Sequence, residues 1–269
     1  MKRRSLSEEE VRTVRAWLKR AGFHRPEEYR PTFLARRILP RFELSGQPDL
    51  EAFLRDADRS AEKRAALFGR FLIPTTEWFR NAEVFEALTH RIRSAVEQGR
   101  WASPKILCAA CSTGEEPLSL SMNLHRIPLP SYDIVCLDRS LSALLRLGSG
   151  TYPDKALRKV DNSLRDLYFN RVAGGWLARD EVRNPLHPLC WDLGVGLPPG
   201  PFHVILLRNV LIYMTEAARR RLLRDAFRSL REGGLLVLGK SESPGRIDRF
   251  GFCVADREQR IYEREGGIE

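Results

Sequence analysis

Two adjacent glutamates follow a glycine bend in the segment from Cys108 to Met122. The segment reads CAACSTGEEPLSLSM, with an apolar strand pattern before it and a helical pattern after it. A bend at such a junction leaves backbone amides exposed at the start of a helix, where doubly wound sheets bind nucleotide-like ligands. Glu115 and Glu116 stand where a phosphate site would place Gly, Lys or Thr, and their carboxylates repel phosphate. Together with Gly114 they favour a ligand that carries hydroxyls and positive charge.

A third carboxylate lies at the end of the next apolar strand pattern. Asp138 closes the run from Tyr132 to Leu137 and follows Gly114 at about the spacing, roughly 20 residues, at which dinucleotide sites place an acid for ribose hydroxyls. Asp138 could instead cap the following helix, as could Ser140, but the bend and the acid together favour ribose binding. S-adenosylmethionine fits both features, because its amino and sulfonium groups are cationic and its ribose carries hydroxyls.

Further polar residues follow the later strand patterns. Asp192 precedes a strand pattern at 202–207 and could accept a hydrogen bond from an adenine amino group. That strand ends at Arg208 and Asn209, which both need partners if they are buried, whereas Tyr213 could be an ordinary half-buried aromatic. The carboxyl edge of the predicted sheet therefore gathers acids, an arginine and an amide.

The segment from Thr75 to Arg80 lies at the junction of the two halves of the chain. It combines hydroxyls, two adjacent aromatics and an arginine. A domain hinge needs only the aromatics, and Arg80 is then a solvated charge. A role of Arg80 in the site is the alternative.

Composition is that of a folded globular protein. The chain has 269 residues, of which 43% are hydrophobic, and this is long enough for one large α/β domain with a smaller attachment. The five cysteines are typical of buried thiols in a reducing compartment, and Cys108 and Cys111 lack the second pair that a zinc site needs. The N-terminal sequence has no apolar signal-peptide region and no stretch approaches transmembrane length. We therefore expect a cytoplasmic protein without a metal or membrane insertion.

The charge balance favours acidic partners. The sequence has 45 Lys and Arg against 35 Asp and Glu, which gives a formal net charge of +10. Such a charge suits nucleic acid, an anionic membrane or an acidic protein surface, although arginine used as a soluble surface residue explains it equally well. Nucleic acid is not the expected partner, because the sequence has no RNA-binding aromatic signature, zinc finger or continuous basic tail.

The first 75 residues are predicted to form a small all-helical domain. Ser7 and Glu10 have the spacing of a capping box and begin a helix over 7–21. Further helices are expected over 31–39, ending near Pro40, then directly after Asp49, and over 60–72. A linker, 76–103, contains the Thr and Arg segment and a helix over 81–98, and it leads to the second domain, 104–269.

The second domain alternates short apolar runs with helical patterns. This alternation predicts a doubly wound α/β fold with a parallel sheet, whose ligands bind at the carboxyl ends of the strands. A turn-rich stretch with Gly174 and Gly175 predicts an inserted β-element within 155–190. The strands of the main sheet are expected at 104–109, 132–137, 202–207 and 233–239, with a final pair within 250–263, and the helices at 115–125, 140–148 and 215–231.

Taken together, these segments resemble the CheR family of chemotaxis receptor methyltransferases, which have a doubly wound S-adenosylmethionine-dependent methyltransferase fold with a helical N-terminal domain and an inserted β-subdomain. The resemblance covers nearly the whole chain and depends on several short segments in order. These are the T-x-F-F-R type segment Thr76–Arg80, C-S-T-G-E-E-P at Cys111–Pro117, the acid Asp138, G-x-Y at Gly150–Tyr152, R-N-V-L-I-Y at Arg208–Tyr213 and G-G-x-L-x-L-G-x-S-E at Gly233–Glu242.

The resemblance implies a function and a set of site residues. The family esterifies glutamate side chains with S-adenosylmethionine, so a protein-glutamate O-methyltransferase that releases S-adenosylhomocysteine is expected. Arg80 and Tyr213 are the implied catalytic neighbours. The implied cofactor contacts are Thr76, Arg80, Glu116, Asp138, Asp192, Leu193, Arg208 and Asn209.

The resemblance also implies a partner. In the family the helical domain and the β-subdomain meet the receptor, which here indicates Arg36, Arg37 and Arg41 and the region 155–185. A helical face of arginines is complementary to acidic helices. The implied partner is therefore the acidic helical cytoplasmic region of a chemoreceptor or a similar protein.

The sequence departs from the family pattern at several positions. Pro74 stands where the family usually has Asn, Ala110 where it has Gly, and His203 where it has Asp. Trp78 replaces one Phe of Phe-Phe-Arg, and Asp192 replaces an Asn. Asp192 keeps an acceptor, whereas Pro74 removes a donor.

The hypothesis for the mechanism is direct methyl transfer to a carboxylate. A carboxylate is nucleophilic at pH 7, so neither a general base nor a metal is needed, and alignment supplies most of the catalysis. Arg80 would orient the incoming carboxylate through a charge-assisted hydrogen bond, and Tyr213 would hold the acceptor oxygen or line the methyl path.

Two alternatives remain at this point. Pro74, Ala110 and His203 are compatible with a non-catalytic module that binds S-adenosylmethionine in signalling. The charge of +10 is compatible with a methyltransferase that has a different acceptor, either a small molecule or a nucleic acid.

Overall fold

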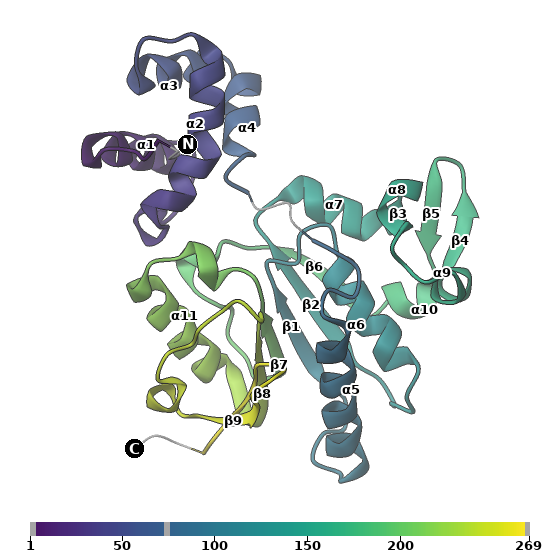
Figure 1. Ribbon diagram of the computed structural model, residues 1–269. Coiled ribbons are helices and arrows are strands. Elements are labelled where there is room, and N and C mark those ends of the chain that lie inside the picture. Colours follow the sequence, from purple (N-terminus) through teal and green to yellow (C-terminus); the bar gives the residue numbers. More distant parts are fainter. Residues whose placement is uncertain (1–3, 73–75, 267–269) are drawn as a thin grey trace. The chain divides into compact units, whose positions relative to one another are not determined.

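The computed structural model describes residues 4–72 and 76–266, and they form two compact units (Figure 1). The first unit holds the residues up to 72 together with Gly194–Gly196 and Leu211–Arg221, and the second holds the rest. Each unit has its own cluster of buried apolar side chains. The two units are therefore described separately.

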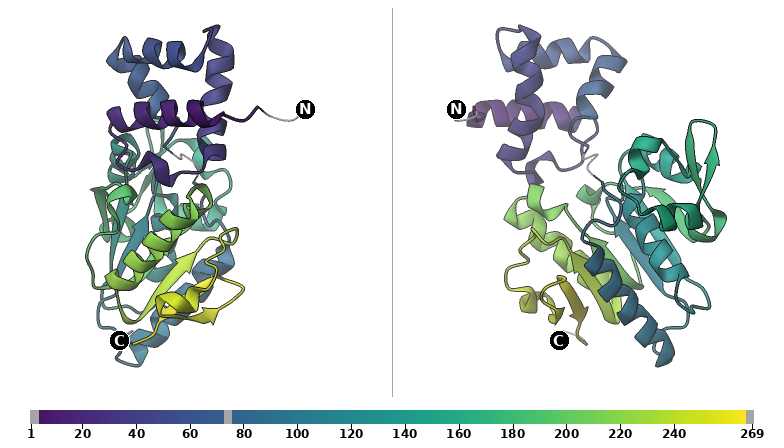
Figure 2. Two further views of the ribbon diagram at one scale, coloured as in Figure 1. Left: turned by 90° about the vertical axis from the view of Figure 1, so that its left-hand side faces the viewer. Right: turned by 45° about the vertical axis from the view of Figure 1, so that its right-hand side comes forward.

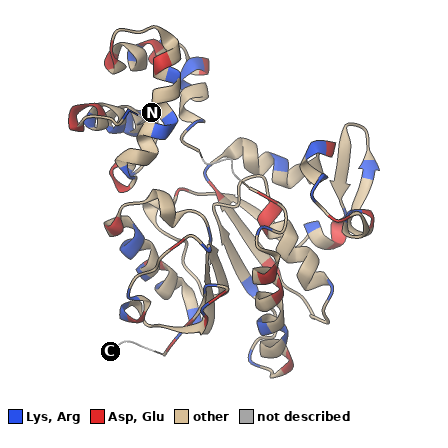
Figure 3. Cartoon of the chain, viewed as in Figure 1, with Lys and Arg blue, Asp and Glu red and all other residues tan. Residues whose placement is uncertain are grey.

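The described part of the first unit is helical. Its α1 begins at the predicted capping box, in which the Ser7 side chain accepts from the Glu10 amide and the Glu10 side chain accepts from the Ser7 amide. Trp17 is buried, and its Nε1 donates to Asp58 across 3.0 Å. Acidic and basic residues are both spread over these helices (Figure 3). The elements are α1 (Glu8–Arg20), the 3-10 helix η1 (Pro26–Glu28), α2 (Pro31–Ser45), α3 (Leu50–Asp58) and α4 (Ala61–Phe68).

The prediction that the second helix ends near Pro40 is wrong. The helix α2 continues to Ser45, and Gly46 then ends it in a left-handed conformation with φ 68°. Proline removes one hydrogen bond from a helix, but Pro40 lies on the exposed side of α2. Leu39 and Phe42 on either side of it are buried, so packing keeps the helix intact through the proline.

The second unit contains a seven-stranded sheet in the order β6-β2-β1-β7-β8-β10-β9. The first five strands of this order pair in parallel, whereas β10 pairs antiparallel with β8 and β9. This arrangement confirms the predicted doubly wound α/β fold. The strands are β1 (Lys105–Ala109), β2 (Asp133–Asp138), β6 (Leu186–Cys190), β7 (Phe202–Leu207), β8 (Leu230–Leu238), β9 (Phe252–Asp256) and β10 (Ile261–Arg264).

Helices cover this sheet and join its strands. Figures 1 and 2 show α5 and α6 beside each other along one face. Their buried side chains, such as Leu88 and Leu118, belong to the same apolar cluster as the strands β1 and β7. In the second unit these helices are α5 (Ala82–Glu97), α6 (Glu115–His125), α7 (Leu141–Ser149), the later part of α11 (Glu216–Ser229) and the 3-10 helix η4 (Ile247–Phe250). The 3-10 helix η3 (Leu211–Tyr213), most of the 3-10 helix η2 (Leu193–Val195) and the start of α11 belong to the first unit.

The strand order reverses direction at β1. From β1, the sheet grows through β2 to one side and through β7 to the other. The register places Cys108 beside both Cys136 and Leu206, so the carboxyl ends of the three strands meet at one edge. Open α/β sheets bind their ligands at such a switch point.

A smaller three-stranded sheet is inserted between α7 and β6, with the order β3-β5-β4. The predicted turn at Gly174 and Gly175 joins β4 to β5. The sequence did not predict β6, which is an edge strand that contains Pro188 and has mostly exposed side chains. The inserted elements are β3 (Thr151–Tyr152), α8 (Asp154–Leu157), α9 (Asn162–Tyr168), β4 (Phe169–Val172), β5 (Gly175–Ala178) and α10 (Asp180–Arg183).

The capping box of α1 gives a prediction for stability. Ser7→Ala removes the side-chain acceptor of the Glu10 amide, so the free energy of unfolding should fall by about 1 kcal/mol in urea titrations followed by circular dichroism. Ser5→Ala is the control, because Ser5 is exposed and makes no hydrogen bond within the described residues. Equal stability of the two variants would contradict the prediction.

Candidate functional site

Backbone strain gathers at the edge of the sheet where β1 and β7 end. Among the described residues, six that are not glycine have positive φ, and five of these lie in three short segments next to this edge. They are Ala110 and Ser112 after β1, Asn209 after β7, and Phe79 and Asn81 before α5. Such conformations cost free energy and persist mainly at functional sites. The backbone alone therefore marks this edge as a candidate site.

The predicted glycine bend is present at the start of α6. Gly114 has φ 95°, and its amide donates to the Cys111 carbonyl across 3.1 Å. A Cβ atom at this position would lie 2.3 Å from Leu147 Cδ1 and 3.0 Å from the Tyr152 hydroxyl. Both the dihedral angle and the close packing therefore require glycine here.

Asp138 holds the loop after β1. Its Oδ2 accepts from the Ser112 amide and its Oδ1 accepts from the Ser140 amide, both at 2.8 Å. Ser140 is itself the N-cap of α7 through its own side chain, so capping does not depend on Asp138. Burial raises the pKa of Asp138, against the effect of these amide bonds. The amides of Ser112, Ser140 and Arg139 use three of about four lone-pair positions on this carboxylate, so about one remains for another donor, such as a hydroxyl.

Arg208 joins three segments of the site. Its side chain is fully buried, and Nη1 lies 2.6 Å from Oε2 of Glu116 in the first turn of α6. Its Nη2 donates to the Arg80 carbonyl across 2.7 Å, and its guanidinium lies over the Phe85 ring. Glu116 also accepts from the Cys108 thiol across 3.2 Å. Arg208 thus uses both terminal nitrogens of its guanidinium to fix Glu116 and the Arg80 backbone, whereas its buried Nε has no hydrogen-bond partner within the described residues.

Asp192 lies two residues after β6, whose last residue, Cys190, is paired with Asp138 in the sheet. The amide of Trp191 donates to the Asp138 carbonyl across 2.9 Å. Asp192 itself forms an ion pair with Arg139 across 3.2 Å, and both side chains are largely buried. Leu193 is buried directly after it. The structure therefore brings Asp192, Asp138, Glu116 and Arg208 to one edge of the sheet.

Glu242 supports the site in a way that was not predicted from the sequence. It is 2% exposed, and its carboxylate accepts from the Val210 amide across 2.8 Å and from the Gly239 amide across 2.6 Å. It thereby fixes the turn that contains Asn209. A Cβ atom on Gly239 would lie 2.9 Å from Asn209 Nδ2. The sequence feature that could have indicated this role of Glu242 is a glutamate that closely follows an apolar strand pattern and a glycine.

The remaining predicted residues are not joined to these carboxylates by any described contact. Thr76 is half-buried and makes no hydrogen bond within the described residues, and Pro74 lies outside them. Tyr213 belongs to the first unit, where its ring packs against Phe33 with the centroids 5.2 Å apart. The predicted place of Tyr213 beside the cofactor therefore stays a prediction.

The Arg80 guanidinium has no carboxylate partner within the described residues, although its backbone is held by Arg208. Arg80 is half-buried. Lys159 lowers the pKa of Glu77 through a hydrogen bond, and the charge of Arg80 adds a smaller effect of the same sign. The site therefore carries an arginine that is available to an anion.

His203 lies at the opposite end of β7 from this site. The Lys105 amide donates to His203 Nδ1 across 2.9 Å, and Arg231 Nη1 lies 2.9 Å from Nε2. Burial and Arg231 lower the pKa of His203. The presence of His203 in place of the Asp that is usual in the family therefore does not alter the carboxyl edge of the sheet.

Residues 4–72 and 76–266 contain no group of three or more His, Cys, Asp or Glu side chains arranged to hold a metal ion. No helix within the same ranges combines the length and the apolar character that crossing a membrane requires.

Ala110 gives a prediction for the loop after β1. It has φ 60°, a left-handed conformation that is strained for alanine and free for glycine. Ala110→Gly should therefore raise the free energy of unfolding by up to about 1 kcal/mol in urea titrations, in spite of the added freedom of the unfolded chain. The adjacent Ala109→Gly is the control and should destabilise, because Ala109 is buried in β1. An equal loss for both variants would show that Ala110 is not strained.

The residues at this edge fit S-adenosylmethionine. Asp138 has about one acceptor position left for a ribose hydroxyl, and the Asp192 carboxylate can accept from an adenine amino group. Glu115 and Glu116 in the first turn of α6 oppose phosphate and favour a cationic ligand.

Comparisons with known proteins agree with this fit. The family described as CheR methyltransferase, SAM binding domain, matches residues 74–257. A chemotaxis protein methyltransferase of Vibrio anguillarum is 33% identical over 79% of this chain and 80% of its own length. A probable biofilm formation methyltransferase WspC of Pseudomonas putida is 29% identical over 77% of this chain and 50% of its own length. A chemotaxis protein methyltransferase of Listeria monocytogenes is 26% identical over 80% of this chain and 82% of its own length.

The extent of the family match and the identity to the Vibrio protein are sufficient to assign the chain. Its cofactor is S-adenosylmethionine, as the residues at the sheet edge indicated. The chain is an S-adenosylmethionine-dependent methyltransferase that belongs to the CheR family.

Proposed function

We propose that the protein transfers a methyl group from S-adenosylmethionine to glutamate side chains in an acidic helical region of a chemoreceptor or a related signalling protein. The products are a glutamate methyl ester and S-adenosylhomocysteine. The observation that carries the proposal is Arg80, a half-buried arginine without a carboxylate partner among the described residues, fixed through its backbone at an acidic cofactor site. The names of the relatives support a role in chemotaxis or biofilm signalling. Such an acceptor places the reaction in the cytoplasm.

The cofactor contacts are proposed residue by residue. Asp138 accepts hydrogen bonds from the ribose hydroxyls, and Asp192 with Leu193 lines the adenine. Glu116, held by Arg208, favours the cationic end of the cofactor. Thr76 and Asn209 complete the set, on the strength of the family resemblance.

The acceptor carboxylate needs orientation but no general base. S-adenosylmethionine supplies an electrophilic methyl group on a sulfonium that leaves as a neutral thioether. Arg80 donates charge-assisted hydrogen bonds to one oxygen of the acceptor carboxylate and directs the other toward the methyl group. Arginine keeps its proton throughout, so Arg80 aligns the acceptor and takes no part in proton transfer. Tyr213 is proposed to bind the acceptor oxygen as well.

Two basic surfaces support an acidic partner. On α2, Arg36, Arg37 and Arg41 form no ion pair within the described residues, so they are available to acidic side chains. Oppositely charged surfaces increase the rate and the specificity of such an encounter. We propose that these arginines bind the helical region of the acceptor protein.

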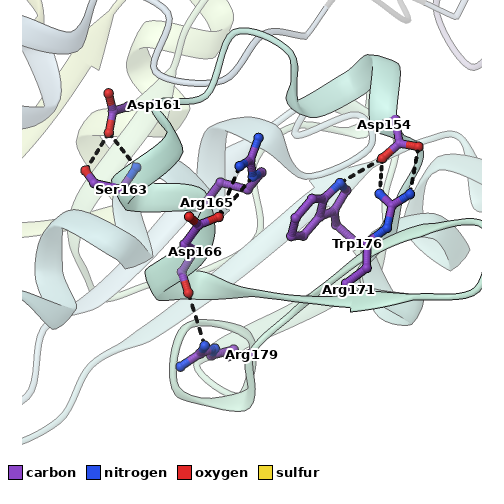
Figure 4. Close-up of polar contacts among 8 residues, drawn as sticks. All are labelled: Asp154, Asp161, Ser163, Arg165, Asp166, Arg171, Trp176 and Arg179. Atoms are coloured by element: carbon purple, nitrogen blue, oxygen red, sulfur yellow. Dashed lines mark hydrogen bonds and ion pairs between the residues drawn. The ribbon is translucent and has the colours of Figure 1, made fainter.

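The inserted sheet carries the second basic surface. The guanidinium groups of Arg165 and Arg171 lie over the Trp176 ring, 4.7 and 5.1 Å from its centroid. Figure 4 shows that Asp154 accepts from both Arg171 and Trp176 Nε1. This arrangement orders the exposed Arg171 and the half-buried Arg165, which also pairs with Asp166, and we propose that the basic region 155–185 contacts the same partner.

A transfer assay tests the proposed function. The full chain is incubated with S-adenosylmethionine labelled in its methyl group and with cytoplasmic fragments of candidate receptors. Glutamate methyl esters release labelled methanol in mild base, so the expected result is base-labile label on the fragment. Tight cofactor binding without transfer to any fragment would favour a non-catalytic module. Label that is stable to base, or that appears on a nucleic acid or a small molecule, would indicate another acceptor.

The role of Arg80 predicts a separation of transfer from binding. Arg80→Ala should lower the transfer rate by about 100-fold or more and weaken S-adenosylhomocysteine affinity by less than about 5-fold, because the side chain serves the acceptor. Arg93→Ala, which removes an exposed arginine from the same unit, is the control and should change neither. Equal losses of transfer and binding in Arg80→Ala would refute this role.

The role of Asp138 predicts a pH dependence of cofactor binding. Burial raises the pKa of this carboxyl, so it takes up a proton at a higher pH than an ordinary aspartate as the solution is acidified. Calorimetry should therefore show S-adenosylhomocysteine affinity that is constant near neutrality and falls as the pH drops through this raised pKa. Asp138→Asn should bind about 10-fold more weakly at neutral pH and lose this decline.

The control for the pH dependence is Asp133→Asn, because Asp133 is an exposed aspartate at the other end of the same strand. This variant should keep both the affinity and the acid decline. A decline that persists in Asp138→Asn would assign the titration to another group.

A further inference from the structure

Tyr152 is buried against the bend that begins α6. It is 0% exposed, and its hydroxyl donates to the Thr113 carbonyl across 2.7 Å. Thr113 directly precedes Gly114, and a Cβ atom on Gly114 would lie only 3.0 Å from the same hydroxyl. Burial and the charge of Glu115 raise the pKa of Tyr152, so its hydroxyl keeps the proton that it donates. Tyr152, the last residue of the G-x-Y segment, thus contacts the loop between β1 and α6.

An aromatic cluster fixes the Tyr152 ring. The ring centroid of Trp78 lies 5.0 Å from that of Tyr152 and 5.5 Å from that of Phe169, in edge-to-face geometry. Trp78 belongs to the segment that contains Arg80, and Phe169 belongs to β4. Edge-to-face pairs of this kind add to the stability that burial alone gives. The cluster therefore restricts where the hydroxyl can lie.

The backbone of Tyr152 is fixed by the inserted sheet. Thr151 and Tyr152 pair antiparallel with Leu177 and Trp176 of β5. A Cβ atom on Gly175 would lie 2.2 Å from the Tyr152 carbonyl oxygen, so the two strands are in close contact at this point. A continuous series of contacts leads from β5 through Tyr152 to Thr113.

We propose that Tyr152 is a positioning residue of the cofactor site, which holds the Thr113–Gly114 bend in its binding conformation and links that bend to the inserted sheet. The bend includes strained residues, and strained backbone needs external contacts to persist. Asp138 holds Ser112 on one side of the bend, and Tyr152 holds Thr113. The inference concerns cofactor binding, so it does not depend on which acceptor is methylated.

The first test removes one oxygen atom. Tyr152→Phe keeps the buried ring and loses the hydrogen bond, so its affinity for S-adenosylhomocysteine in calorimetry should fall about 3- to 10-fold. Amide hydrogen exchange across residues 109–114 should become faster in the cofactor-free variant, because the bend loses a contact.

The matched control is Tyr168→Phe. Tyr168 is also a buried tyrosine of the inserted region, and its hydroxyl lies 3.2 Å from the Met122 carbonyl oxygen in the last part of α6. This variant should keep both the affinity and the exchange rate of 109–114, even if it unfolds at a lower temperature. An unchanged affinity in Tyr152→Phe, or equal changes in both variants, would overturn the proposal.

A second pair of variants tests the link to the inserted sheet. Gly175→Ala forces β5 and β3 apart at the Tyr152 carbonyl and should also weaken cofactor affinity, by about 3-fold or more. Gly174→Ala is its control, because Gly174 is in the same hairpin but a Cβ atom there meets no atom within 4 Å. An affinity that falls in Gly174→Ala as much as in Gly175→Ala would contradict transmission through Tyr152.

Discussion

The burial of the Arg208 guanidinium is the constraint on which the site depends. A fully buried charge is costly unless it is paired, and here Glu116 is the carboxylate partner and the Arg80 carbonyl accepts a further hydrogen bond, while Nε has no partner within the described residues. Arg208 directly follows β7, Glu116 lies in the first turn of α6 and Arg80 precedes α5, so one side chain sets the relative positions of three segments. Other carboxylates hold the strained backbone nearby, because Asp138 accepts from the Ser112 amide and Glu242 accepts from the Val210 amide beside Asn209.

The pairing of charges at this edge explains why it suits a cationic ligand. Glu116 and Asp192 are each neutralised by an arginine, whereas the partners described for Asp138 are backbone amides. Asp138 thus keeps a negative charge in a partly buried place, and burial raises its pKa accordingly. A ligand with hydroxyls and positive charge relieves that cost, whereas a phosphate would increase it.

The sequence predicted the parts of the fold that have strong local signals. The helix at 115–125 and the strand at 202–207 agree with the structure residue for residue, because a glycine bend and a continuous apolar run define them. The edge strand β6 was not predicted, because its residues around Pro188 are mostly exposed and form a strand only through pairing with β2. The end of α2 was not predicted, because the helix continues past Pro40 through the packing of buried residues on either side of it. The carboxylates of the site were predicted because parallel strands end at one edge. The segments that contain Glu242 and Tyr152 were singled out in the sequence, but the roles of these two residues were not predicted, because their partners are backbone atoms whose positions depend on the fold.

The most direct test of the buried ion pair is a double-mutant cycle between Glu116 and Arg208, read as S-adenosylhomocysteine affinity by calorimetry. Glu116→Gln and Arg208→Lys each disturb the same pair, so the double variant should lose clearly less affinity than the two single losses combined, with a coupling of about 1 kcal/mol or more. Losses that add within about 0.5 kcal/mol would show that the two residues act independently. That result would contradict the dependence of the site on this pair.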